Sequence, residues 1–280
     1  MSDAITANEL GINPVQANKG QQWFESIVNR IGSISIALIV PLLVLAIWQL
    51  ASQKEWVSPQ ILPPPSLVWE TLVGLWDSGD LTLNLGISIE RVAYGFLVGS
   101  IAGLLLGGLM GLSKTVEAYL YPTFKALSQI PALGWIPLLI MLVGIGEAMK
   151  VLVITKAALV PVVINTHQGI RNIPQQFLEV AKVYRFNTLQ LLRKVVIPAA
   201  LPSLFNGLRY GLTHSWLALV TVELLASSEG IGFLMVWGRQ LFQLDLVLAT
   251  VVVIGAVGLV LDQSLQWIEA HFLKWRRVAF

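Results

Sequence analysis

The sequence contains no cysteine and few charged residues. Without cysteine, the chain can form no disulfide, no thiolate metal site and no cysteine nucleophile. Charged residues make up 12% of the chain, about half the share in a soluble globular domain, whereas hydrophobic residues make up 55%. The apolar runs are continuous, so they lack the alternation of a transmembrane β-barrel. This composition excludes an ordinary soluble domain and predicts an all-α membrane protein with several spans.

Six apolar runs are long enough to cross a bilayer, which takes about 20 residues in a helix. The expected spans are about 31–51, 88–112, 126–146, 149–168, 200–226 and 246–265. We also expect a flexible tail over residues 1–20, an interfacial helix over 21–30 and a transmembrane domain over 31–275. Six spans place both termini on one side of the membrane.

The distribution of lysine and arginine indicates which side that is, because cytoplasmic loops of membrane proteins are rich in both. Cytoplasmic termini would place twelve of the eighteen basic residues inside: Lys19, Arg30, Lys114, Lys125, Arg171, Lys182, Arg185, Arg193, Lys194, Lys274, Arg276 and Arg277. The outer connections would hold only Lys54, Lys150 and Arg239. We therefore expect both termini in the cytoplasm.

The fourth and fifth spans are joined by a long cytoplasmic connection, residues 169–197, which includes the string "EVAKVYRFNTLQLLRKVVIP". Phe177, Val180, Ala181 and Tyr184 recur at helical spacing and form one apolar face. Asn187 follows and can cap a second helix. The pattern predicts a helix–turn–helix elbow below the bilayer, with an apolar face and a basic face. The alternative is a basic loop that only fixes the topology.

The elbow resembles a motif of the permease subunits of bacterial ABC importers, in which Glu-Ala-Ala opens a cytoplasmic coupling loop. Glu179 and Ala181 occupy motif positions, and the Ile-Pro pair that closes the loop ends at Pro198. The segments "ILPPPSLVWETL", "INTHQGIRNI" and "ELLASSEGIGFL" are similar to the nitrate, sulfonate, taurine and bicarbonate branch, and the aliphatic-sulfonate permeases look most similar. Arg185 departs from the family, which usually has glycine there. We expect the elbow to turn later, at Asn187, or to form a continuous bent helix.

The resemblance implies a type I importer permease with a MetI-like fold in the bacterial inner membrane. It implies no catalytic residue, no metal and no cofactor in this chain, because ATP and Mg are bound by two separate ATPase subunits. The other implied partners are a second permease, either another copy in a homodimer or a homologous chain, and a periplasmic solute-binding protein; nucleic acid is not one. The residues expected to couple to the ATPase are Glu179, Ala181, Lys182, Tyr184 and Arg185.

Three ionisable residues fall within or near the expected spans, where such residues are costly and usually functional. Lys156, Arg209 and His214 are candidates to line a path for an anion. Arg209 could instead extend to the interface, and His214 could simply bond a neighbouring helix. By the family resemblance, Gly230, Ile231 and Gly232 open a short periplasmic gate helix; an interfacial helix is the alternative.

Span two carries glycine at every fourth position, at Gly95, Gly99, Gly103, Gly107 and Gly111. Small residues at this spacing let two helix backbones approach closely in lipid. The stripe is therefore expected to be a helix contact, either a static one, a sliding seam between moving halves or a face of a dimer.

The cargo expected from the resemblance is a small anion, with aliphatic sulfonate or taurine first and nitrate, nitrite, cyanate or bicarbonate as alternatives. A secondary transporter driven by an ion gradient would show internal repeats and coupling-ion ligands at the midplane, and no convincing repeat is evident. A membrane-embedded enzyme would need a catalytic constellation, and none is found in the spans.

Overall fold

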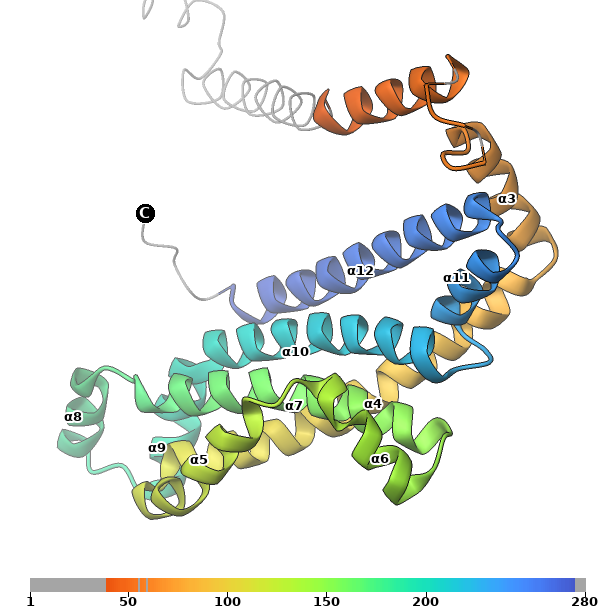
Figure 1. Ribbon diagram of the computed structural model, residues 1–280. Coiled ribbons are helices and arrows are strands. Elements are labelled where there is room, and N and C mark those ends of the chain that lie inside the picture. The colour runs from red at the N-terminus through yellow and green to blue at the C-terminus, as the bar shows by residue number, and fades with distance from the viewer. Residues whose placement is uncertain (1–38, 55, 59, 275–280) are drawn as a thin grey trace, which may run out of the picture. The chain divides into compact units, whose positions relative to one another are not determined.

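The computed structural model describes residues 39–54, 56–58 and 60–274. The expected tail over 1–20, the interfacial helix over 21–30 and the first part of span one therefore lie outside the described residues. Every regular element in the described part is helical, which confirms the all-α prediction (Figure 1). The chain divides into two units, residues 1–67 and 68–280.

The first unit contains an apolar helix, Ile39–Gln53, followed by a proline-rich segment. This segment folds back on the helix: the Trp48 indole donates to the Pro63 carbonyl at 3.0 Å, and the Ser52 hydroxyl donates to the Leu62 carbonyl at 3.3 Å. Pro63, Pro64 and Pro65 supply no backbone N–H, so carbonyls of this segment have fewer backbone donors and accept from side chains instead.

Helix α3 (Pro65–Asp77) leads into the second unit. The elements that follow are α4 (Asp80–Leu112), α5 (Lys114–Ser128), a 3₁₀ turn (Ala132–Trp135), α6 (Ile136–Val143), α7 (Glu147–Arg171), α8 (Gln175–Val183), α9 (Thr188–Leu191), a π-helical turn (Leu192–Val196), α10 (Ile197–Ala226), α11 (Ile231–Gln240) and α12 (Leu244–Phe272). Among the described residues, α4, α12 and the run from α9 to α10 are each long and apolar enough to cross a membrane.

The expected third span, 126–146, is not one helix. Helix α5 ends at Ser128, the 3₁₀ turn follows, and the two apolar pieces are bent by 91°. Pro131 explains the break, because proline cannot donate a helical hydrogen bond and forces the preceding Ile130 away from the helical conformation. The bend leaves backbone carbonyls at the break without helical partners.

Helix α7 lies between α4 and α10, which pack along it. The glycine stripe of α4 faces α7: a Cβ added to Gly103 would lie 2.8 Å from Val162, and one added to Gly107 would lie 2.7 Å from the Val163 carbonyl. On the α10 side, a Cβ on Gly207 would lie 2.8 Å from Asn165. The stripe is thus a contact within the chain, so the dimer-face interpretation is wrong for it.

We predict that Gly103→Leu lowers the free energy of unfolding by about 1–3 kcal/mol, because a larger side chain would force α4 and α7 apart. Gly108→Leu on the same helix is the matched control, since nothing lies within 4 Å of a Cβ added there. Melting temperatures of the two variants in the same detergent check this prediction. Equal melting temperatures would contradict it.

Candidate functional site

The elbow predicted from the sequence is present as α8 and α9. Helix α8 ends in a Schellman motif, in which the Phe186 N–H donates to the Ala181 carbonyl at 3.0 Å and the Arg185 N–H donates to the Lys182 carbonyl at 2.9 Å. Arg185 has a φ of 53°, in the left-handed region. The chain therefore turns at Arg185 itself, and both alternatives expected from the sequence, a later turn and a continuous bent helix, are wrong.

Asn187 caps α9 as predicted. Its side chain accepts from the Gln190 N–H at 2.8 Å, and the Gln190 side chain accepts from the Asn187 N–H at 3.1 Å, which completes a capping box. Two tight terminal motifs in succession therefore fix the angle between α8 and α9.

Four of the five residues expected to couple to an ATPase lie exposed on the elbow: Glu179, Lys182, Tyr184 and Arg185. Ala181 is only 2% exposed. It lines a hollow of about 270 Å³ together with Phe186 and Pro198, so it is not presented at the surface as the other four are. The apolar residues Phe177, Val180 and Val183 are exposed beside the charged ones. The surface of the elbow thus combines apolar and charged side chains.

Lys156 and His214 line one cavity of about 440 Å³, which lies between the 3₁₀ turn, α7 and α10. Lys156 Nζ donates to the Ile130 carbonyl, one of those freed by the break after α5, and lies 5.3 Å from the centre of the Trp135 ring. His214 Nδ1 is 3.0 Å from the carbonyl of Tyr210 on its own helix.

Arg209 does not line this cavity. Its Nε and Nη2 atoms donate to the two carboxylate oxygens of Asp262 on α12, at 2.5 and 2.7 Å. A bidentate pair of this kind fixes both side chains. Of the three candidate path residues, Lys156 and His214 therefore line the same cavity. Arg209 instead forms part of the contact between α10 and α12.

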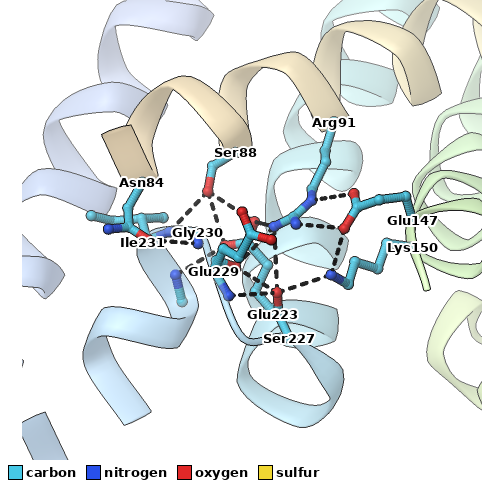
Figure 2. A network of polar contacts seen from close by, with 11 residues as sticks. Asn84, Ser88, Arg91, Glu147, Lys150, Glu223, Ser227, Glu229, Gly230 and Ile231 are labelled. Carbon is cyan, nitrogen blue, oxygen red and sulfur yellow. Dashed lines mark hydrogen bonds and ion pairs between the residues drawn. The ribbon is translucent and has the colours of Figure 1, made fainter. Parts of the chain in front are cut away.

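A cluster of polar groups, here called the Glu223 network, joins four helices at the end where α7 begins (Figure 2). It comprises Asn84, Ser88, Arg91, Glu147, Lys150, Glu223, Ser227 and the backbone of residues 229–232. The Glu223 carboxylate is completely buried. It accepts from the Ser88 hydroxyl at 2.8 Å, from Arg91 Nη1 at 2.8 Å and from the Gly232 N–H at 2.9 Å.

The three gate residues expected from the sequence begin α11 and belong to this network. Their successive N–H groups donate to side chains of other helices: Gly230 to Asn84, Ile231 to Ser88 and Gly232 to Glu223, at 2.8, 2.9 and 2.9 Å. The first N–H groups of a helix have no partner within it, and a carboxylate is favourable there. Helix α11 is therefore capped by α4 and α10.

The two glycines permit this close approach. A Cβ on Gly230, whose φ is 105°, would collide with the Glu223 carboxylate, and one on Gly232 would lie 2.7 Å from the Glu223 Cβ. Side chains at either position would push the start of α11 off the carboxylate.

Arg91 is the centre of the network and was missed by the sequence analysis, as were Glu147 and Lys150. Arg91 Nε and Nη2 donate to the two oxygens of Glu147 at 2.7 and 2.6 Å, while Nη1 donates to Glu223 and to the Glu229 carbonyl. One signal was available: a buried arginine in an apolar span needs acidic partners. Glu223, in another span, could have been paired with it.

Comparison with known proteins identifies the chain. Residues 95–274 match the model of the family described as binding-protein-dependent transport system inner membrane component. The chain belongs to this family. Its members are non-catalytic membrane subunits of ABC importers, so the chain is a transport subunit and not an enzyme, and ATPase and substrate-binding partners and dimerisation follow for it as a class.

Several curated relatives are similar over most of their length. The putative aliphatic sulfonates transport permease protein SsuC of Bacillus subtilis is 40% identical over 85% of this chain and 87% of its own. The bicarbonate transport system permease protein CmpB of Synechococcus elongatus is 35% identical over 96% and 99%. The nitrate import permease protein NrtB of Synechocystis is 34% identical over 81% and 84%. The chain is thus an ABC importer permease of the sulfonate, nitrate and bicarbonate branch.

The fold agrees. A permease chain from the inward-facing MetNI methionine ABC transporter superimposes with a TM-score of 0.51 at 20% identity, over 77% of this chain and 98% of that chain. This similarity confirms the type I importer permease fold.

We predict that Arg185→Gly stabilises the elbow relative to Arg185→Ala by about 1 kcal/mol, because only glycine adopts a left-handed conformation without steric cost. Both variants remove the arginine side chain, so their difference isolates the backbone term. Hydrogen exchange at residues 184–187 checks the prediction, with slower exchange expected in the glycine variant. Faster or equal exchange would contradict it.

Proposed function

We propose that the chain translocates a small anion in an ATP-driven importer, with an aliphatic sulfonate or taurine as the first candidates. The cavity shared by Lys156 and His214 carries this proposal. An ammonium group in a cavity of low dielectric attracts an oxyanion, and an imidazole N–H can donate a second hydrogen bond. The name of the Bacillus subtilis relative, an aliphatic sulfonates permease, supports the choice of sulfonate.

The elbow is the proposed contact with the ATPase. Its exposed apolar residues, Phe177, Val180 and Tyr184, would seat in a groove of the partner, while Lys182 and Arg185 would make contacts at the rim that set orientation more than affinity. Two ATPase subunits, which bind ATP and Mg, would each hold one elbow of a permease homodimer.

The proposed orientation places both termini and the elbow in the cytoplasm of a bacterium and the Glu223 network at the periplasmic end. Gly230, Ile231 and Gly232 would then begin a periplasmic gate helix, α11, next to a docked solute-binding protein. Closure of the ATPase pair would move the elbows and open the path outward, and hydrolysis would reset it.

Bicarbonate, nitrate, nitrite and cyanate form the second set of candidates. The bicarbonate relative CmpB favours this set, because its similarity extends over almost the whole of both chains. A more distant alternative is an ion-coupled secondary transporter, which would transport anions without ATP or partners.

Uptake into proteoliposomes containing the permease, its ATPase and its binding protein tests the proposed substrate. We expect ATP-dependent uptake of ethanesulfonate that exceeds uptake of nitrate and bicarbonate at least tenfold. Uptake of an uncharged compound, with no uptake of any of these anions, would contradict the proposal. Anion uptake without ATP would favour the secondary transporter.

In the same assay, we predict that Lys156→Met lowers the uptake rate at least tenfold, because it removes the fixed positive charge of the cavity. Lys125→Met is the matched control: Lys125 is exposed on α5 and does not line the cavity, so uptake should stay near the wild-type rate. An unchanged rate in Lys156→Met would remove Lys156 from the path.

For the elbow, we predict that the double variant Lys182→Glu/Arg185→Glu weakens association with the ATPase at least tenfold, since it reverses the charge at the proposed rim. Lys114→Glu/Lys125→Glu makes the same change in net charge at two exposed residues of α5, outside the elbow. Co-purification and ATPase coupling measure both. Equal behaviour of the two double variants would rule out the assigned contact.

A further inference from the structure

The Glu223 network contains two buried cations that meet at one exposed carboxylate. The Glu147 side chain is 60% exposed, whereas those of Arg91 and Lys150 are 4% and 6% exposed. Arg91 holds both oxygens of Glu147, at 2.7 and 2.6 Å, and Lys150 Nζ donates to one of them at 2.8 Å (Figure 2). The exposed carboxylate of Glu147 is therefore bound by two buried cations, Arg91 and Lys150.

The charge balance explains why an anion belongs at this position. Glu223 neutralises one of the two cations and is itself occupied by Ser88 and the Gly232 N–H. Among the described residues, the polar partners of Lys150 Nζ are Glu147 and the Ser227 hydroxyl, the latter at 3.0 Å. If Glu147 left, the network would hold an uncompensated buried positive charge, which is strongly unfavourable. Another anion in the same place would restore neutrality.

The geometry suits an oxyanion in general. A guanidinium fork binds two oxygens of one group in parallel, and an ammonium adds a third donor without fixed direction. A sulfonate, a carboxylate or nitrate presents such a pair of oxygens. Glu147 is the first residue of α7 and follows Gly144, whose φ is 78°, and Gly146. Glycines on this side allow the backbone to rearrange when the side chain leaves.

The position of Arg91 and Lys150 along the helices suits a site at which an anion enters the path to the cavity. Lys150 and Lys156 lie about 9 Å apart along α7 at the helical rise. Along α7 and α10, the apolar residues Val153 and Val222 lie between the network and the cavity of Lys156 and His214, and Ala218 of the same cluster forms part of the cavity wall. An anion held by Arg91 and Lys150 would thus be separated from the cavity by an apolar seal one or two turns thick.

We propose that Arg91 and Lys150 form an oxyanion-binding site which Glu147 occupies as a tethered competitor, and that the transported anion displaces Glu147 there. The identity of the anion as cargo rests on the proposed function, whereas the site itself does not. Exchange of one anion for another leaves the buried charge unchanged, and the displaced Glu147 carboxylate gains water. Displacement is therefore limited chiefly by the high local concentration of a tethered group.

Anion-dependent melting of the purified full-length chain tests the site, with sodium methanesulfonate titrated against sodium chloride at constant ionic strength. We expect Glu147→Gln to bind methanesulfonate with a dissociation constant at least tenfold lower than that of the wild type. Glu229→Gln is the matched control: it also removes one exposed carboxylate beside the network, but only the backbone carbonyl of Glu229 contacts Arg91. It should behave as the wild type does.

Adding Lys150→Met to Glu147→Gln should abolish the gain. The proposal is overturned if Glu147→Gln and Glu229→Gln respond equally, if chloride acts as strongly as methanesulfonate, or if the gain survives without Lys150. Should Glu147→Gln fail to fold, Glu147→Asp is the second variant, because it keeps the charge but shortens the tether by one methylene. We expect it to lower the dissociation constant for methanesulfonate, and an unchanged constant would contradict the proposal.

Because this measurement uses no ATP, ATPase or binding protein, it separates the two proposals. Anion binding in Glu147→Gln together with transport of an uncharged cargo would reject the proposed function and keep the site. Anion transport by the importer, with no tighter methanesulfonate binding in Glu147→Gln, would reject the site and keep the proposed function.

Discussion

The pairing of Arg91 with Glu223 is the interaction on which the arrangement of this permease depends. Neither charge is readily left alone in a bundle of apolar helices, because removing one partner of a buried ion pair costs about 3–5 kcal/mol. Arg91 must therefore stay on Glu223, which keeps α4 on α10. The same carboxylate caps α11, and the other side of the guanidinium holds the start of α7 through Glu147.

The glycine seam and the ionic pair support each other. Close contact between α4 and α7, made where no side chain intervenes, brings Arg91 within reach of Glu147. The ionic contact in turn adds a specific pairing between the two helices at one end of the glycine seam. Of the interpretations that the sequence left open for the stripe, close helix packing within the chain agrees with these contacts.

The fold class and the approximate helix positions followed from composition and apolar length, because both depend on the local chain. The break at Pro131 did not follow: proline is tolerated within membrane helices, so its presence alone does not show where one ends. Arg185 illustrates the opposite error. A rule that reserves left-handed conformations for glycine predicted a later turn or a continuous bent helix, yet the Schellman hydrogen bonds at the end of α8 hold an arginine in that conformation.

For the candidate sites, sequence reasoning found what short-range patterns encode: the elbow, the Asn187 cap and the start of α11. It missed the Glu223 network, because Arg91 is 56 positions from Glu147 and 132 from Glu223. It also grouped Arg209 with Lys156, since both are cations in spans. Only three-dimensional contacts show that Asp262 neutralises Arg209 while Lys156 faces a cavity.

Helices α9 and α10, with the π-helical turn between them, form one run of 39 residues from Thr188 to Ala226. At the helical rise its length along the chain is about 60 Å, and the π-helical turn and Pro198 and Pro202 are places where such a run bends. The elbow stands at one end, His214 lies partway along it and Glu223 lies near the other end. One continuous helical run therefore connects α9 of the elbow, the cavity residue His214 and the buried carboxylate of Glu223.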